Sequence, residues 1–325
     1  MKPLRFSAIL KKTLWGGEDI ITMKHLPDCN DNIGESWEIS GVPNAETLVT
    51  SGEDAGSTLA ALIRKYRGNL MGKANYARYG ETFPLLVKFI SNSRPLSVQV
   101  HPDDEMAHRL GHPCGKTEMW YVVDAQPGAS VFLGFNHEFS KEGLLESLND
   151  GTLMQHLASY PSVAGDCYFI PAGCIHSIGS GNFVIEIQQT SDDTFRVYDF
   201  DRVDANGNKR QLHIAQACEA LNFKMETDSR ILYSAMANQP VDLVSCREFT
   251  TRLLQVDRAT MLDYSDIDSF VIYIAYEGGA LLEDSEGNSV DVVKGQSVLF
   301  PAQNNQVKIF PNEQKGFACL ETFIK

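Results

Sequence analysis

The sequence lacks any excess of positive charge. Its 325 residues carry 28 lysines and arginines against 42 aspartates and glutamates, a formal net charge of −14. Nucleic-acid-binding proteins usually present a basic face, so this balance argues against a nucleic-acid partner. It leaves open an anionic small ligand, because a pocket can be locally positive on an acidic protein.

Long apolar runs and paired cysteines are also missing. Residues 1–9 alternate polar and apolar side chains without the apolar core of a signal peptide. No segment approaches the ~18–20 apolar residues of a membrane helix. The seven cysteines are odd in number, scattered, and include no C-x-x-C pair. This pattern argues against a disulfide framework and a thiolate zinc site. We therefore expect a cytoplasmic protein with reduced thiols and no membrane partner.

The composition is that of an ordinary globular protein, with 43% hydrophobic and 22% charged residues. At roughly 100–200 residues per domain, the length predicts about two domains. Short β-rich runs divided by Gly, Pro, Asn and Asp predict an all-β barrel or sandwich. In the first part of the chain the expected strands are 38–40, 84–90, 96–100, 119–123, 130–135, 167–170, 183–188 and 196–199. In the last part they are 253–256, 270–276, 280–283, 289–293, 297–300, 306–309 and 317–323. Apolar spacing predicts helices only over 59–66, 140–157 and 212–223.

An internal repeat divides the chain. Residues 165–176 match residues 295–306 without a gap, each as a turn, a buried strand, a Pro-Ala corner and a polar residue that re-enters the sheet. The last residue is His176 in the first copy and Gln306 in the second. We therefore predict two related β-domains, a metal-binding catalytic one over 1–235 and a degenerate one without metal over 236–325.

The metal prediction depends on a few polar side chains. Alternate residues of a strand point to one face, so Ser97, Gln99 and His101 face the same way. Glu118 and His176 add two further donors. Two imidazoles with oxygen ligands suit Zn²⁺, with Fe²⁺, Mn²⁺ or Co²⁺ as alternatives. An ion held by Gln99, His101, Glu118 and His176 would retain net positive charge and act as a Lewis acid.

The spacing around the last of these ligands resembles a known motif. Gly165, Pro171, Gly173 and His176 form the pattern Gly-x5-Pro-x-Gly-x2-His, which resembles the second motif of the cupins, double-sheet β-barrels. The second copy keeps only the first glycine and the proline.

Nearly the whole chain resembles the type I mannose-6-phosphate isomerases of the cupin superfamily, in their short bacterial form. The resemblance implies a mainly β fold of two cupin-like double-sheet (jelly-roll) barrels with a few short helices. The large helical domain of the long form is expected to be missing, and only the short helical stretch at 140–157 could stand in its place. The motifs that carry the resemblance are Leu-Trp-Gly-Gly at 14–17, Gly-Glu-Ser-Trp-Glu at 34–38, Pro-Leu-Leu-Val-Lys at 84–88, residues 96–103, residues 115–121 and Phe-Arg-Val-Tyr-Asp at 195–199.

The same resemblance implies a reaction and its residues. The family interconverts D-mannose 6-phosphate and D-fructose 6-phosphate through a cis-enediol. Its zinc ligands map onto Gln99, His101, Glu118 and His176, one zinc per chain. Its cation over the reacting carbons maps onto Arg196, while Lys116 and Glu186 are two candidates for the general base.

For the substrate phosphate we expect three anchors. Ser97 lies about 13 Å along the strand from His101 at ~3.3 Å per residue, so an extended sugar phosphate could reach both. Lys88 resembles a second phosphate contact of the family, and Arg202 is a weaker candidate. The expected partner is the sugar phosphate, and the chain is expected to be a monomer or homodimer.

Two other functions stay open: a cupin isomerase of another sugar or sugar phosphate, and a non-catalytic sugar-binding protein with two cupin domains. His108 and His112 are expected in a surface loop, because Gly111 and Pro113 disfavour a helix that would pair them. Cys114 and Cys174 are expected to be inert thiols.

Overall fold

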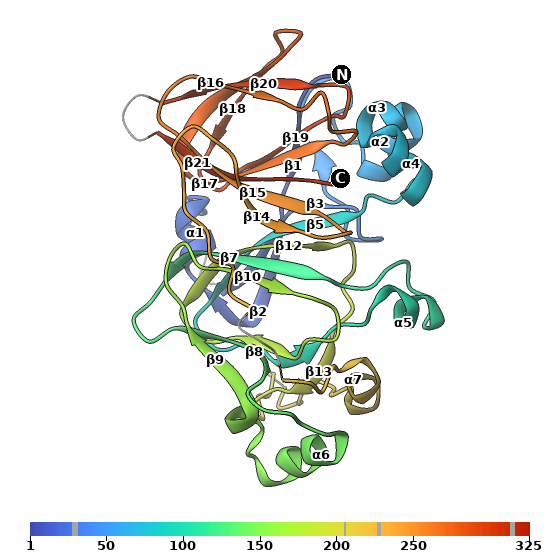
Figure 1. The fold of residues 1–325 in the computed structure, drawn as a ribbon, viewed down its shortest axis with the longest axis vertical. Helices are drawn as coiled ribbons and strands as arrows, with labels where there is room; N and C mark the ends of the chain where they lie inside the picture. The colour runs from blue at the N-terminus through green and yellow to red at the C-terminus, as the bar shows by residue number, and fades with distance from the viewer. Residues whose placement is uncertain (28–31, 205, 226–228, 313–315) are drawn as a thin grey trace. The chain divides into compact units, whose positions relative to one another are not determined.

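The computed structural model describes residues 1–27, 32–204, 206–225, 229–312 and 316–325. It confirms a mainly β fold with few helices and several antiparallel sheets (Figure 1). Among the described residues, no helix has both the length and the apolar character needed to cross a membrane.

Strands outnumber helices among the described residues. The strands are β1 (Leu4–Ser7), β2 (Ile9–Gly17), β3 (Ile33–Ser40), β4 (Leu48–Val49), β5 (Leu85–Asn92), β6 (Val98–Val100), β7 (Glu118–Ala125), β8 (Ser130–Phe135), β9 (Leu157–Pro161), β10 (Cys167–Ile170), β11 (His176–Ile178), β12 (Asn182–Gln189), β13 (Phe195–Tyr198), β14 (Val241–Ser245), β15 (Thr250–Val256), β16 (Thr260–Asp263), β17 (Val271–Asp284), β18 (Ser289–Val293), β19 (Ser297–Phe300), β20 (Gln306–Pro311) and β21 (Phe317–Phe323). The helices are α1 (Asp19–Met23), α2 (Leu59–Tyr66), α3 (Gly68–Met71), α4 (Lys73–Tyr79), α5 (Asp104–Arg109), α6 (Lys141–Asp150) and α7 (Ile214–Ala220), with a 3₁₀ turn η1 (Leu153–His156).

The chain divides into two compact units that are not contiguous in sequence. Unit 1 comprises Met1–Ile9, Trp37–Val87 and Leu232–Lys325, and unit 2 comprises Leu10–Ser36 and Lys88–Ile231. The later boundary falls between Ile231 and Leu232. Residues 1–9 and 37–87 group with the C-terminal strands, and β1 pairs with β19. The chain crosses between the units within β2, β3 and β5.

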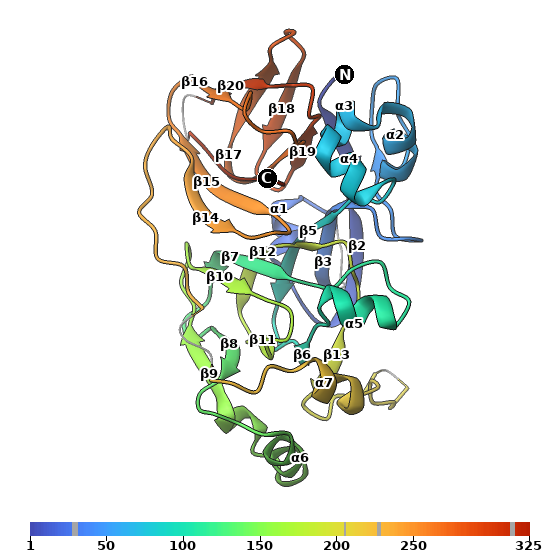
Figure 2. The same ribbon diagram turned by 45° about the vertical axis from the view of Figure 1, so that its right-hand side comes forward.

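Unit 1 is built on a ten-stranded sheet that contains β1, β4 and all strands from β14 to β21. Its core is formed by aliphatic and aromatic side chains of β15 to β21. The helices α2, α3 and α4 form one small group beside these strands (Figure 2). The Asp268 carboxylate accepts hydrogen bonds from the first two backbone N–H groups of α4 (Lys73 and Ala74, both 2.9 Å), which fixes that helix within the unit.

Unit 2 contains two sheets. One has the order β10-β7-β12-β5-β2-β3 and the other β13-β6-β11-β8-β9. Side chains from both sheets, among them Trp15, Trp120, Leu133 and Tyr168, form one core cluster between them. A second cluster lies on the other face of the five-stranded sheet, where side chains of α6 and α7 cover it.

The strand alternation around β6 agrees with the prediction. Val98 and Val100 are fully buried in the cluster covered by α6 and α7. Ser97 and Gln99 lie on the opposite face and line a cavity. Polar side chains therefore point to the interior of unit 2.

The internal repeat is visible in the elements. In the first copy, β10 begins two residues after Gly165 and β11 begins at His176. In the second copy, β19 begins two residues after Gly295 and β20 begins at Gln306. Both glycines have positive φ (92° and 84°), a conformation that glycine adopts without steric cost. The two copies therefore share local structure as well as sequence.

The helix predictions were correct in part. The helix over 59–66 is confirmed as α2, with the Thr58 side chain accepting from the Ala61 N–H. The helix predicted from Ser140 begins there but ends at Asp150, because Gly151 takes a left-handed conformation; 157 already belongs to β9. The helix predicted over 212–223 is the shorter α7. Four short α-helices were missed, and so were the strands β1, β2, β4, β9, β11, β14 and β16. Most of these elements are short, and short elements carry few periods of their pattern.

Candidate functional site

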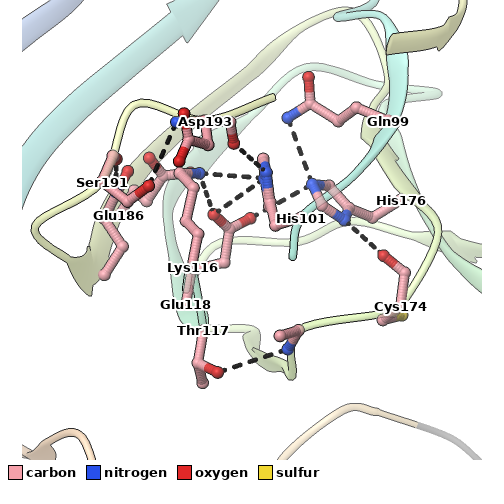
Figure 3. A network of polar contacts seen from close by, with 12 residues as sticks. Gln99, His101, Lys116, Thr117, Glu118, Cys174, His176, Glu186, Ser191 and Asp193 are labelled. Carbon is pink, nitrogen blue, oxygen red and sulfur yellow. Dashed lines mark hydrogen bonds and ion pairs between the residues drawn. The ribbon is translucent and has the colours of Figure 1, made fainter. Parts of the chain in front are cut away.

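Three buried side chains converge at the centre of unit 2. One ligand atom each of His101, Glu118 and His176 lies within 4.8 Å of the other two. The two Nε2 atoms lie 3.5 Å and 3.4 Å from oxygens of the Glu118 carboxylate. The three residues come from separate places in the chain: His101 follows the end of β6, Glu118 starts β7 and His176 starts β11. Figure 3 shows the carboxylate facing both imidazoles.

Both imidazoles are oriented by main-chain carbonyls. The Nδ1 of His101 lies 2.7 Å from the carbonyl oxygen of Asp193, and that of His176 lies 2.9 Å from the carbonyl oxygen of Cys174. A carbonyl only accepts, so Nδ1 carries the proton and Nε2 keeps a lone pair. Burial lowers the pKa of His176 to about 4 and lowers that of His101 well below its ordinary value. Both rings are therefore neutral and present a ligand atom.

The amide of Gln99 completes the cluster. Its Nε2 lies 3.2 Å from the Nε2 of His176, and its Oε1 accepts a hydrogen bond from the Ser97 hydroxyl at 3.1 Å. Residues Gln99 and His176 are direct partners in the β6–β11 ladder, which fixes their proximity. The amide nitrogen rather than the oxygen faces the imidazole, so the role of Gln99 as an oxygen ligand stays a prediction.

The Lys116 ammonium lies inside the same cluster. It donates to the Nε2 of His101 at 3.0 Å and forms a short contact with one oxygen of Glu118. The other oxygen, Oε1, is buried and accepts no hydrogen bond from the described residues. Burial raises the pKa of Glu118 to about 7, and the Lys116 charge offsets part of that shift.

The donor set fits a divalent cation. It offers two neutral imidazole nitrogens and a buried carboxylate oxygen without a hydrogen-bond donor, which are ligands that zinc and similar ions prefer. A cation would also favour the ionised form of the buried Glu118 carboxylate.

A second buried ion pair lies beside the cluster. The Lys88 ammonium is 3.0 Å from Oε1 of Glu186 and 3.9 Å from Oε2 of Glu35. The Trp120 indole N–H donates to Oε2 of Glu186 at 3.0 Å. Burial would raise the pKa of Glu186, but the charges of Lys116 and Lys88 lower it to about 2. Burial would lower the pKa of Lys88, but Glu186 and Glu35 raise it above its ordinary value.

A cavity of about 300 Å³ opens next to these groups within unit 2. Gln99 and Lys116 form part of its wall, so it adjoins the cluster of His101, Glu118 and His176. The lining residues are Trp15, Glu35, Lys88, Ile90, Leu96, Ser97, Gln99, Lys116, Glu186, Asp192, Thr194, Arg196 and Arg210. The cavity is therefore mostly polar and carries charges of both signs.

Arg196 lies next to Gln99 in the β13–β6 ladder and lines the cavity. Its Nη1 donates to the carbonyl oxygen of Gln211 at 2.9 Å. Its Nε is buried and has no hydrogen-bond partner among the described residues. Burial lowers its pKa, and the nearby charge of Arg210 lowers it further. A guanidinium remains charged under such conditions, so it is a fixed cation in the cavity wall.

The predicted site residues thus fall into two groups. The four predicted metal ligands lie together, and Lys116, Glu186, Arg196, Ser97 and Lys88 surround the adjoining cavity. Arg202 is the exception: it does not line the cavity, and its guanidinium contacts Asp199 and the carbonyl oxygen of Pro95.

Several residues of the site had no sequence signal that we recognised. Arg210 lines the cavity from a loop, and no strand or helix pattern indicates where a loop arginine points. The carbonyl of Asp193 orients His101, and a main-chain contact of this kind is independent of the side chain. Glu35 lies within the Gly-Glu-Ser-Trp-Glu motif, so its motif could have signalled a role.

The remaining predictions for single residues can be compared directly. His108 was expected in a loop but lies in α5, so that prediction was wrong. His112 lies beyond the helix end at Arg109, and the two histidines do not share the helix. The thiol of Cys114 has its pKa raised by burial to about 12, and Cys174 is buried. The six cysteines among the described residues are reduced; Cys29 lies outside the described residues.

Comparison with known proteins gives consistent matches. A family model described as the catalytic domain of type I phosphomannose isomerase matches residues 4–126. A mannose-6-phosphate isomerase of Streptococcus mutans is 34% identical over 85% of this chain and 86% of the relative. A putative mannose-6-phosphate isomerase of Bacillus subtilis is 31% identical over 93% of each chain. Among solved structures, the mannose 6-phosphate isomerase of Bacillus subtilis matches 100% of both chains with a TM-score of 0.88 and 29% identity.

Proposed function

The chain belongs to the type I mannose-6-phosphate isomerases, and we propose that it interconverts D-mannose 6-phosphate and D-fructose 6-phosphate through a cis-enediol. The observation that carries this proposal is the buried cluster of His101, Glu118 and His176 beside a polar cavity. An aldose–ketose isomerisation needs stabilisation of charge on two substrate oxygens and a group that moves a proton between two carbons. The cavity wall offers both.

We propose that one Zn²⁺ per chain is held by His101, Glu118, His176 and Gln99, with Fe²⁺, Mn²⁺ or Co²⁺ as substitutes. The first three residues present buried ligand atoms. The fourth would use its amide oxygen. A divalent ion bound there would supply Lewis acidity toward the sugar oxygens at C1 and C2.

Arg196 acts as the fixed cation near the reacting carbons in this proposal. Its side chain lines the cavity and its Nη1 is held by the carbonyl oxygen of Gln211, so the guanidinium would hold a fixed positive charge beside a bound substrate. A donor held in place before the reaction stabilises developing negative charge without reorganisation of the site.

The proton transfer falls to Lys116 or Glu186, which both line the cavity. Glu186 is ion-paired with Lys88, accepts from Trp120, and has a pKa of about 2, so it is a weak proton acceptor. Lys116 also lines the cavity, and its Nζ contacts two of the proposed ligands, His101 and Glu118. The low pKa of Glu186 favours Lys116 for the proton transfer, with Glu186 holding Lys88 in place.

The proposal is tested by an assay that couples fructose 6-phosphate formation to a recorded signal, with mannose 6-phosphate as the substrate. The protein is assayed as purified, after removal of metal by a chelator, and after zinc is restored. We expect turnover to vanish on removal and to return with zinc. Equal turnover of the stripped protein would exclude the metal role, and binding without turnover in every state would favour a non-catalytic sugar-binding protein.

A further inference from the structure

The charged side chains at the cavity fall into two groups, one with an excess of negative charge and one with an excess of positive charge. In the first group, Lys88 lies between two carboxylates, those of Glu186 and Glu35. Asp192 also lines the cavity and contributes to the raised pKa of Lys88. This group has more negative than positive charges around the lysine, so it does not favour a dianion.

The second group has the opposite balance. The side chains of Arg202 and Arg210 both contact the carboxylate of Asp199. Arg196 is close enough that Arg210, Asp199 and Arg202 all affect its pKa. Two guanidinium groups therefore share one carboxylate, and the charge of a third, Arg196, lies nearby. An excess of positive charge at a cavity wall favours an anion, and a phosphomonoester carries about −1.5 to −2 charges at neutral pH.

The two arginines on Asp199 have different surroundings. Arg202 also contacts the carbonyl oxygen of Pro95, and its guanidinium lies 5.4 Å from the centre of the Phe200 ring. It is absent from the cavity wall. Arg210 lines the cavity, and its contacts with Asp199 use Nε and Nη2. Arg202 therefore braces the carboxylate, while Arg210 presents a guanidinium edge to the cavity.

The loop that carries Arg210 is fixed by the sequence of its turn. Val203 and Lys209 pair as an antiparallel bridge. The carboxylate of Asp204 accepts from the backbone N–H groups of Asn206 and Asn208 at 2.8 Å and 2.9 Å, which closes the turn between them. This hairpin returns the chain to Asp199.

The residues after Arg210 are tied to β13. The backbone N–H of His213 donates to the carbonyl of Arg196 at 2.8 Å, and the Arg196 guanidinium holds the carbonyl of Gln211. Arg210 is thus held between two anchored points, and its side chain is 28% exposed. A side chain placed in this way can bind a ligand with little loss of conformational entropy.

We propose that Arg210, together with Ser97, binds the phosphate group of the substrate, and that Arg202 positions Asp199 instead of contacting the phosphate. This assignment deepens the proposed function and rests on it. This assignment differs from the expectation that Lys88 contacts the phosphate. The Lys88 ammonium lies beside the carboxylates of Glu186 and Glu35 instead. Ser97 belongs to the same region, since the Pro95 carbonyl bound by Arg202 lies two residues before it.

The test compares Arg210→Ala with the matched control Lys209→Ala in the full-length, zinc-loaded protein. Lys209 is the neighbouring cation, but it contacts the exposed Asp201 and does not line the cavity. Binding of inorganic phosphate is measured by calorimetry, and KM and kcat are measured with mannose 6-phosphate. A charge-assisted hydrogen bond is worth about 1.5–3 kcal/mol, or roughly tenfold to hundredfold in affinity.

We expect Arg210→Ala to weaken phosphate binding and raise KM by about tenfold or more, with kcat changed by less than about threefold. Arg210→Lys restores part of the affinity, because lysine supplies a charge without the planar fork. Lys209→Ala behaves as the wild type. Circular dichroism spectra and zinc content show whether each variant is folded. Arg210→Ala should fold, because Asp199 keeps Arg202 as a partner.

Two results would overturn the assignment: phosphate affinity of Arg210→Ala within twofold of the wild type, or an equal loss in Lys209→Ala. Failure of the proposed function has a different signature. In that case the wild type does not isomerise mannose 6-phosphate, while phosphate binding still distinguishes Arg210→Ala from the control.

Discussion

The imidazole of His112 pairs with the carboxylate of Asp193, with Nδ1 2.9 Å from Oδ2. Asp193 also provides the main-chain carbonyl that accepts from Nδ1 of His101. A half-exposed histidine on one loop thus fixes a second loop, which in turn orients a proposed metal ligand. Partners of this kind tune the affinity of metal sites.

We predict that His112→Ala weakens zinc binding by up to about tenfold, since it acts through Asp193 and direct partners of a ligand are worth roughly 10–100-fold. Zinc affinity is measured by competition with a chelating dye. His108→Ala is the control, because its imidazole contacts Pro113 and not Asp193. Equal affinities for both variants and the wild type would contradict the prediction.

The repeat suggests a substitution at the proposed metal site itself. His176→Gln places in the first copy the residue that Gln306 provides in the second. We predict that zinc content falls to a small fraction of one per chain, because a buried imidazole ligand is lost. Metal analysis after dialysis measures this loss. Gln306→His should bind no additional zinc, and a second zinc in that variant would show that the C-terminal copy retains a site.

Lys116 and Glu186 can be separated by isotope exchange. We predict that Lys116→Gln lowers kcat by about 10²–10⁴-fold and abolishes deuterium transfer from solvent to the substrate carbons. Glu186→Gln should retain measurable exchange, because its carboxylate is engaged by Lys88 and Trp120. Nuclear magnetic resonance of the products in D₂O detects the label, with zinc content measured for each variant. Lost exchange in Glu186→Gln alone would reverse the assignment.

Asp199 gives a prediction on pH. Burial would raise the pKa of its carboxyl, but the guanidinium groups of Arg210 and Arg202 hold it below its ordinary value of 3.8. The folded state therefore binds fewer protons than the unfolded state near that pH, and stability falls as the pH drops through this range. Asp199→Asn should lose less stability than the wild type between pH 5 and 3.

Urea unfolding at a series of pH values measures this slope. Asp201→Asn is the matched control, since this exposed aspartate contacts only Lys209 among the ion pairs of the described residues. It should keep the wild-type slope. A slope in Asp199→Asn that equals the wild type would show that the arginines do not stabilise the ionised carboxylate.

Gly72 gives a prediction on stability. Its backbone has φ 90° and ψ 148°, a region that only glycine populates readily, and an added Cβ would lie 1.9 Å from the carbonyl oxygen of Asp268. Gly72→Ala should lower the free energy of unfolding by at least ~3 kcal/mol. Gly52→Ala also has positive φ, but its Cβ would meet no atom within 4 Å, so about 1–2 kcal/mol is expected. Equal losses of unfolding free energy in the two variants, measured by urea unfolding, would contradict the predicted clash between the added Cβ at residue 72 and the carbonyl oxygen of Asp268.

Sequence alone determined the β character of the chain and the repeat, and it picked out His101, Glu118 and His176, which the fold brings together. Strand alternation placed Ser97 and Gln99 on one face, and the Gly–Pro–Gly–His spacing marked His176, because both are local patterns with a fixed geometry. The same local reasoning identified α2 and the start of α6 at Ser140.

Tertiary structure alone decided how these pieces combine. Residues 1–9 join the C-terminal strands through the pairing of β1 with β19, which depends on a partner almost 300 residues away. Arg202 and Arg210 differ in role only because the hairpin between them returns Arg210 to the cavity. The carbonyl of Asp193 orients His101 without any contribution from its side chain. Contacts between distant segments and main-chain atoms have no local pattern, so they become visible only in the folded chain.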